Sequence, residues 1–163
     1  MKYSINPISD QEANAVLDIF NYYVENSFAA YPDKRLPRNS FDALLGLASG
    51  LPTGTIKDLN GRVAGFGMLR PYSPLPTFSK TAEVTYFLHP DYTGKGLGNA
   101  LLTYLENKAK EKGVRTILAN ISSLNRLSID FHLKNGFSEC GRFLKIGEKK
   151  EQPFDIVWMQ KMI

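Results

Sequence analysis

The stretch HPDYTGKGLGNALL, residues His89 to Leu102, places three glycines within five positions and then continues as an apolar run with helical spacing. Glycine in a helix interior costs roughly 1 kcal/mol relative to alanine, so glycines at a helix start suggest that something approaches the main chain closely. Backbone N–H groups there lack intrahelical partners, and the helix dipole adds partial positive charge. The stretch therefore predicts a turn that could bind a phosphate.

Two common phosphate-binding loops do not fit this spacing. A nucleotide-hydrolase P-loop has four residues between its glycines and then Gly-Lys-Ser/Thr, whereas Gly98 precedes Asn99 and Ala100. A dinucleotide-binding loop reads G-x-G-x-x-G, with an acidic residue about 20 positions later, whereas here G-x-G-x-G is followed by the strand-like run VRTILANIS. On spacing alone, a tight strand-to-helix turn without a ligand remains an equal alternative.

Composition indicates one ordinary globular domain. The 163 residues are 43% hydrophobic and 22% charged, and no repeat or domain boundary interrupts residues 1–163. The net charge of +4 comes from scattered basic residues, which argues against nucleic acid and is compatible with a small phosphorylated ligand. The N-terminus lacks a signal-peptide core, no segment is apolar enough for a membrane, and Cys140 has no disulfide partner, so we expect a cytoplasmic protein.

Hydrophobic periodicity predicts helices and strands around the glycine loop. Residues 10–26 and 97–112 each carry one apolar helical face, and Gly113 is typical of a helix C-cap. Asn60-Gly61 predicts a hairpin with a type I′ turn, in which both central residues have positive φ. The other predicted elements are helices at 38–49 and 125–135 and strands at 53–59, 62–70, 82–90, 114–122, 137–147 and 154–162. This order predicts an α/β fold with a mixed sheet, whose central strand leads into the glycine loop.

Six segments in order resemble the acetyl-CoA-dependent GNAT N-acetyltransferase superfamily. HPDYTGKGLGNALL is similar to its phosphate loop, Gln/Arg-x-x-Gly-x-Gly/Ala, and NRLSIDFHLKNGF follows. The segments IFNYYVENSFAAY, NGRVAGF, EVTYFLHP and FDIVWMQK resemble the phosphinothricin and methionine-sulfoximine acetyltransferase branch, so nearly the whole chain is covered. The resemblance implies a GNAT fold, with a mostly antiparallel sheet of about seven strands and helices on both faces. It also implies acetyl-CoA as co-substrate and a homodimer.

The resemblance implies that the pantetheine arm of the coenzyme lies in a splay between the strands at 82–89 and 115–121. Backbone groups of Phe87 and Leu88 would bond its amides, and N–H groups from Gly94 to Asn99 would hold the pyrophosphate, where side chains would block the approach. Thr93 stands where the family carries Gln or Arg, and Lys95 or backbone donors would compensate. The implied coenzyme-binding residues are Tyr86, Phe87, Leu88, Gly94, Lys95, Gly96, Leu97, Gly98, Asn99, Asn125 and Ser128.

Two residues are candidates for proton transfer. An alkylammonium of pKa about 10 must lose a proton before it attacks, which costs roughly 4 kcal/mol at pH 7. Glu83 begins an apolar strand and matches a glutamate implicated in catalysis in the resembling branch; the alternative is a solvated carboxylate, or one paired with Lys80 or Arg70. His132 matches a histidine common in that branch and would act at the coenzyme thiol, although a lone histidine on a helix is often structural.

The acceptor is expected to be a small amino acid or analogue. The candidate contacts are Tyr31, Arg70, Tyr72, Phe78, Lys80 and Glu83. Leu75 and Thr77 are less basic than the matching loop of the branch, which argues against phosphinothricin itself. A polyamine, an aminoglycoside, a protein N-terminus and a non-catalytic acyl-CoA-binding module remain alternatives.

No metal site is expected. The two histidines are far apart in sequence, and no CxxC motif is present. Cys140 has no base placed beside it, so it is expected to act as a small hydrophobe rather than a nucleophile. His89, which precedes Pro90, is expected to pack or cap.

Overall fold

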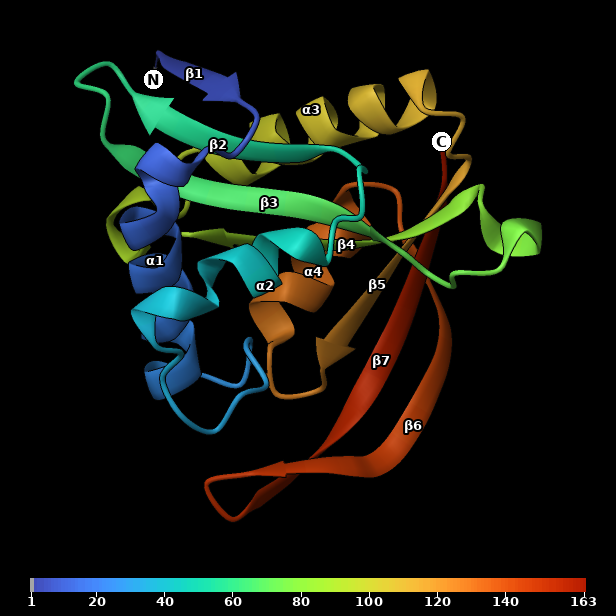
Figure 1. The fold of residues 1–163 in the computed structure, drawn as a ribbon. Helices are drawn as coiled ribbons and strands as arrows, with labels where there is room; N and C mark the ends of the chain where they lie inside the picture. Colours follow the sequence, from blue (N-terminus) through green and yellow to red (C-terminus); the bar gives the residue numbers. More distant parts are fainter. Residues whose placement is uncertain (1) are drawn as a thin grey trace.

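The computed structural model describes residues 2–163 as a seven-stranded sheet with helices on both faces (Figure 1). The strands are β1 (Tyr3–Asn6), β2 (Thr53–Asp58), β3 (Val63–Pro71), β4 (Thr81–Leu88), β5 (Thr116–Ser122), β6 (Ser138–Lys149) and β7 (Gln152–Met162). The α-helices are α1 (Ala13–Asn26), α2 (Phe41–Gly46), α3 (Leu97–Glu111) and α4 (Arg126–Lys134). The strand order is β1-β2-β3-β4-β5-β7-β6, and among these strands only β4 and β5 pair in parallel. The predicted α/β class and mostly antiparallel sheet are confirmed.

Each face of the sheet has its own apolar core. Alternate residues of a strand point to opposite faces, so Val84 packs towards α3 whereas Phe87 packs towards α1. Leu101 and Leu105 of α3 are fully buried on the first face, and each such side chain contributes about 1.5–3 kcal/mol. None of the helices formed by residues 2–163 combines the length and apolarity needed to span a bilayer.

Three details differ from the sequence predictions. β1 was not predicted, because its four residues, YSIN, are mostly exposed and carry no apolar alternation. The predicted helix at 38–49 reduces to a 3-10 turn at Arg38–Ser40 and the six-residue α2. The predicted type I′ turn is wrong: Gly61 has a positive φ of +77° and Asn60 does not. A three-residue loop forms instead, because the Asp58 carboxylate accepts bonds from the N–H groups of Asn60 and Arg62.

Candidate active site

The parallel strands β4 and β5 separate near the middle of the sheet. Their pairing runs from Thr81 with Thr116 to Glu83 with Leu118, and within residues 2–163 it does not continue further. β5 instead remains paired with β7 along its whole length, up to Ser122. The predicted splay between these strands is therefore present (Figure 1).

The main-chain groups that face the splay belong to alternate residues of β4. His89 donates its N–H to the Ala64 carbonyl at 2.8 Å, so by the alternation of an antiparallel pair the main-chain groups of Phe87 face β3. Those of Tyr86 and Leu88 face the gap, where the Leu88 carbonyl accepts the Tyr23 hydroxyl at 2.6 Å. The main-chain groups of Phe87 are therefore not placed to bond the pantetheine amides as expected, whereas those of Tyr86 face the gap between β4 and β5.

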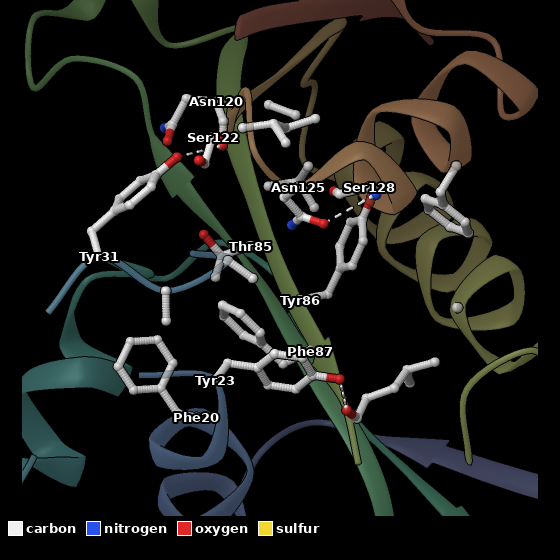
Figure 2. A pocket seen from close by; sticks show the side chains of 18 of the residues that line it. Phe20, Tyr23, Tyr31, Thr85, Tyr86, Phe87, Asn120, Ser122, Asn125 and Ser128 are labelled. Carbon is white, nitrogen blue, oxygen red and sulfur yellow. Dashed lines mark hydrogen bonds between the residues drawn. The ribbon is translucent and has the colours of Figure 1, made fainter. Parts of the chain in front are cut away.

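A cavity of about 720 Å³ occupies the splay and is lined from both faces of the sheet. Phe20 and Tyr23 of α1 line it on one side and His132 of α4 on the other. Figure 2 shows Phe87 next to Tyr23, and Tyr86 near Asn125 and Ser128. Ten predicted site residues line this cavity: Tyr31, Arg70, Tyr86, Phe87, Leu88, Gly94, Gly98, Asn125, Ser128 and His132. Eight do not: Tyr72, Phe78, Lys80, Glu83, Lys95, Gly96, Leu97 and Asn99.

The glycines of the loop have two structural roles. Gly94 and Gly96 have φ values of +71° and +80°, which favour glycine, and Gly96 is the N-cap of α3. A Cβ on either would lie in open space, whereas one on Gly98 would come within 3.2 Å of the Phe131 ring. The first two glycines thus provide backbone conformation and the third allows α4 to pack closely. The first N–H groups of α3 still lack intrahelical partners beside the cavity.

Side chains near this loop bond to neighbouring backbone or to one another. Thr93 donates its hydroxyl to the Pro90 carbonyl at 2.9 Å, and Lys95 donates to the Asp91 carbonyl at 2.6 Å. The Asn99 side chain accepts a bond from Asn135 at 3.2 Å, and Leu97 is buried in the core. The Lys95 ammonium thus bonds within the loop in this structure. Backbone donors remain for an anion.

His132 is buried in a defined hydrogen-bond chain. Its Nδ1 lies 2.7 Å from the Ser128 carbonyl, which can only accept, so Nδ1 carries the proton. Its Nε2 then accepts the Tyr86 hydroxyl at 2.5 Å. Burial lowers the pKa of His132 and raises the pKa of Tyr86 well above its ordinary value, so at neutral pH both groups are uncharged. Ser128 thus orients the histidine. Asn125 caps α4 by accepting the Ser128 N–H at 3.3 Å.

Glu83 lies behind the cavity wall rather than on it. Its Oε2 accepts Arg70 Nη2 at 2.6 Å and Asn120 Nδ2 at 3.1 Å, and both of those residues line the cavity. Its Oε1 accepts no hydrogen bond from residues 2–163, and the side chain is 12% exposed. The pairing with Arg70 that the sequence left open is therefore present, and one carboxylate oxygen remains available.

The comparisons with known proteins agree with this geometry. Residues 16–137 match the Acetyltransferase (GNAT) family. The chain belongs to the GNAT acetyltransferase family. It is 29% identical over 150 residues to the L-amino acid N-acyltransferase MnaT of Escherichia coli, covering 90% of this chain and 86% of that one. It is 28% identical over 162 residues to the L-methionine sulfoximine/L-methionine sulfone acetyltransferase of Pseudomonas paraeruginosa, covering 98% and 94%.

A solved relative extends the comparison to the coenzyme. The yncA structure from Salmonella typhimurium, determined with its cofactor acetyl-CoA, has a TM-score of 0.91 and 26% identity, covering 99% of this chain and 94% of that one. In this acetyltransferase the main-chain groups of Tyr86 and Leu88 face the splay, and α3 begins after Gly96 with N–H groups that lack intrahelical partners. The residues of the site therefore fit acetyl-CoA as co-substrate of an acyltransferase.

The acceptor residues predicted for the acetyltransferase divide into two groups. Tyr31 donates its hydroxyl to the Asn120 carbonyl at 3.3 Å, and burial raises its pKa to about 12, so at neutral pH it is an uncharged hydrogen-bonding group beside Arg70. Tyr72 and Phe78 contact each other, with ring centroids 5.6 Å apart, on the exposed loop after β3. Lys80 is also exposed outside the cavity. The structure thus places Tyr31 and Arg70 together and leaves Tyr72, Phe78 and Lys80 away from them.

Three residues that bond groups in or next to the site were not singled out from the sequence. Asn120 bonds Glu83, Tyr23 bonds Leu88, and Lys149 donates to the carbonyls of Ser27 and Ala30 at 2.7 and 2.8 Å. A polar residue in the apolar strand run ILANIS was the only available signal, and it pointed to Asn120. Tyr23 and Lys149 gave no such signal, because Tyr23 falls on the apolar face of the predicted first helix and Lys149 lies in the charged run EKKE.

The minor expectations concern metals, His89 and Cys140. His89 caps the turn after β4, since its Nδ1 accepts the Asp91 N–H at 3.3 Å. Cys140 is an exposed free thiol that donates to the Trp158 carbonyl. Over residues 2–163, no three His, Cys, Asp or Glu side chains gather as metal ligands would.

Proposed function

We propose that this acetyltransferase transfers the acetyl group of acetyl-CoA to the primary amine of a small amino acid or amino-acid analogue. The observation that carries the acceptor class is Arg70, which lines the cavity and whose buried Nε–H has no partner within residues 2–163. An unpaired buried donor costs about 1–3 kcal/mol, and more when it is charged. A substrate carboxylate would supply the missing acceptor. The relatives named for L-amino acids and methionine sulfoximine support the same class.

Polycationic acceptors have less support. The residues that line the cavity include neither aspartate nor glutamate, so a polyamine or aminoglycoside would bury several ammonium groups without carboxylate partners. Glu83 is already paired with Arg70 behind the wall.

Acetyl-CoA, when bound, supplies the thioester that the acceptor amine attacks. Tyr86 and Leu88 would bond the pantetheine through their main chains, and N–H groups at the start of α3 would hold the pyrophosphate. Glu83 would take the ammonium proton through a water molecule at Oε1, because the carboxylate does not itself line the cavity. Asn120 and Arg70 hold that carboxylate in place, and the ordered cavity supplies proximity.

On the thiol side, His132 would act through Tyr86. The neutral histidine has its one proton on Nδ1, bonded to Ser128, so it has none to give at Nε2. The Tyr86 hydroxyl stays protonated at neutral pH and would donate a hydrogen bond to the leaving sulfur when it turns from Nε2. His132 is then a positioning residue for that hydroxyl.

We propose that residues 1–163 form one acetyltransferase domain that works as a cytoplasmic homodimer without a metal. The free thiol of Cys140 is compatible with a reducing compartment. β6 is an edge strand that exposes Phe143, Leu144 and Ile146, and an exposed apolar edge is suited to a second copy. Light scattering of the intact chain and of Leu144→Glu tests this: we expect a dimer that the substitution dissociates, and a monomeric wild type would contradict it.

The test of activity is thiol release from acetyl-CoA with methionine, methionine sulfoximine, phosphinothricin, spermidine, an aminoglycoside and a peptide with a free N-terminus. We expect turnover on amino acids and no turnover on methionine methyl ester, which lacks the carboxylate. Arg70→Lys, which keeps the charge and loses the guanidinium fork, should raise the amino-acid KM roughly 10–100-fold. Equal rates on the methyl ester, or turnover only on polyamines, would contradict the proposed acceptor.

A further inference from the structure

The hydroxyl of Tyr23 bonds one of the main-chain groups that face the splay. Tyr23 lies on α1 and lines the cavity, and its hydroxyl donates to the Leu88 carbonyl at 2.6 Å. Figure 2 draws this bond as a dashed line from the Tyr23 hydroxyl. Burial raises the pKa of Tyr23, so at neutral pH the hydroxyl keeps its proton and acts as a donor.

The Leu88 carbonyl depends on this donor because strand pairing does not reach it. Over residues 2–163, the pairing of β4 with β5 ends at Glu83 with Leu118, whereas the Leu88 carbonyl faces the gap further along β4. A main-chain carbonyl that is kept from water without a donor costs about as much as a lost hydrogen bond. Tyr23 therefore satisfies an acceptor that the sheet leaves open.

The pantetheine arm would use the same carbonyl. In the proposed binding mode the arm lies beside β4 as a strand would, and one of its amide N–H groups bonds Leu88. A neighbouring strand lies about 4.8 Å away in the plane of the sheet. The Tyr23 hydroxyl oxygen is 2.6 Å from the Leu88 oxygen on the cavity side, so it lies within the space that the arm would fill. The hydroxyl and the arm therefore compete for one position.

We propose that Tyr23 is a positioning residue that competes with the pantetheine arm of the coenzyme for the Leu88 carbonyl. Its hydroxyl bonds the carbonyl before the coenzyme binds, gives it up to the pantetheine amide, and takes it back when the spent coenzyme leaves. Tyr23 thus limits how tightly the coenzyme is held, which favours product release. This inference rests on the pantetheine contact of the proposed function and adds a residue that regulates it.

Tyr23→Phe tests the competition by calorimetry. It keeps the aromatic ring, whose centroid lies 5.2 Å from that of Phe87, and removes only the hydroxyl. The free protein then loses a hydrogen bond that the coenzyme complex does not contain, so the Kd for coenzyme A should fall roughly 3–10-fold. Adenosine 3′,5′-bisphosphate has the nucleotide of the coenzyme and no pantetheine arm. Its Kd should be the same for Tyr23→Phe and the wild type.

A matched variant and a spectroscopic signal complete the test. Tyr22 is adjacent, exposed and outside the cavity lining, so Tyr22→Phe removes a hydroxyl from the same helix and should leave the coenzyme Kd unchanged. Fluorine NMR of protein labelled with fluorotyrosine reports on the hydroxyl directly. The Tyr23 resonance, assigned as the one missing in Tyr23→Phe, should shift when coenzyme A is added and stay in place when the bisphosphate is added.

The outcomes separate this inference from the proposed function. Unchanged or weaker coenzyme binding in Tyr23→Phe would overturn the inference, because the carbonyl would then accept both donors or the arm would lie elsewhere. Equal tightening of the bisphosphate, or a Tyr23 resonance that coenzyme A does not move, would overturn it as well. These titrations contain no acceptor, so they decide the inference even if no amino acid is acetylated. A wild type that does not bind coenzyme A would overturn the proposed function and the inference together.

Discussion

The coenzyme half and the acceptor half of the cavity are built in different ways. On the coenzyme side, the proposed contacts are main-chain groups of Tyr86, Leu88 and the start of α3, which lie close together in the chain. On the acceptor side they are side chains from α1, α2, β3 and β5, which the sheet brings together. A local backbone feature can be recognised from a short motif, whereas a set of distant side chains cannot.

The acceptor side also depends on a segment from the far end of the chain. Lys149, buried at the end of β6, donates to the carbonyls of Ser27 and Ala30, and Phe154 of β7 stacks on Tyr31 with centroids 5.9 Å apart. The β6–β7 hairpin thus holds the connector that lines the acceptor side of the cavity, whereas on the coenzyme side the glycine loop continues directly into α3. Substitutions on one side of the cavity should therefore change coenzyme binding or acceptor binding without changing the other.

The largest effect is expected on catalysis itself. Glu83→Gln removes the carboxylate and should lower kcat/KM about 10²–10³-fold while the coenzyme Kd stays unchanged. Glu106→Gln is the matched control. Glu106 is a similarly buried carboxylate that pairs with Lys161 at 2.6 Å, and it does not line the cavity. Steady-state kinetics and coenzyme titration check both variants. A normal rate in Glu83→Gln would contradict the proposed role of Glu83 as the general base.

A smaller effect is expected on the coenzyme side. Gly96→Val forces a β-branched residue to a φ of +80° and should weaken coenzyme binding roughly 10-fold, with unchanged ratios among acceptors. Gly50→Val has the same strain, at a φ of +83°, but lies away from the cavity, so it should cost stability without changing coenzyme affinity. Equal coenzyme titrations for the two variants would show that the loop does not bind the pyrophosphate.

The hairpin contact predicts an effect on the acceptor side alone. Lys149→Met leaves the Ser27 and Ala30 carbonyls without their donor, so unfolding free energy should fall by about 1–3 kcal/mol and acceptor KM should rise a few-fold. Lys150→Met is the control, because Lys150 is exposed and its ammonium bonds the Glu25 carbonyl at the end of α1 rather than the Ser27 and Ala30 carbonyls. Urea denaturation and acceptor titration give the two quantities. If coenzyme Kd changed as much as acceptor KM, the two halves would not be separable in this way.

The smallest effect is a pH dependence of stability. Burial lowers the pKa of His132 below that of the unfolded chain, so the unfolded state binds the proton first as pH falls. Stability from this group is therefore complete above about pH 6.5 and declines below it, by about 1.4 kcal/mol for each pH unit by which folding lowers the pKa of His132. His132→Gln should flatten urea midpoints between about pH 7.5 and 5.5, whereas His89→Gln, at an exposed position, should not. Parallel curves for all three proteins would contradict the prediction.

Much of the fold was predictable because its signals are local. Hydrophobic spacing located α1 and α3, and β-branched and aromatic runs located β3, β4 and β5. The failures were also local in origin. Polar β1 carries no pattern, and the Asp58 carboxylate set the turn at Asn60-Gly61 by competing for its N–H groups.

The glycine loop, the strand that leads to it and the helix that follows were readable from consecutive residues, because backbone conformation depends on immediate neighbours. The bond from Asn120 to Glu83, and the chain from Tyr86 through His132 to Ser128, were not. Those contacts join residues far apart in the chain. They exist only where β4 and β5 separate and the helices on both faces meet, because side chains interact through distances that only the folded sheet sets.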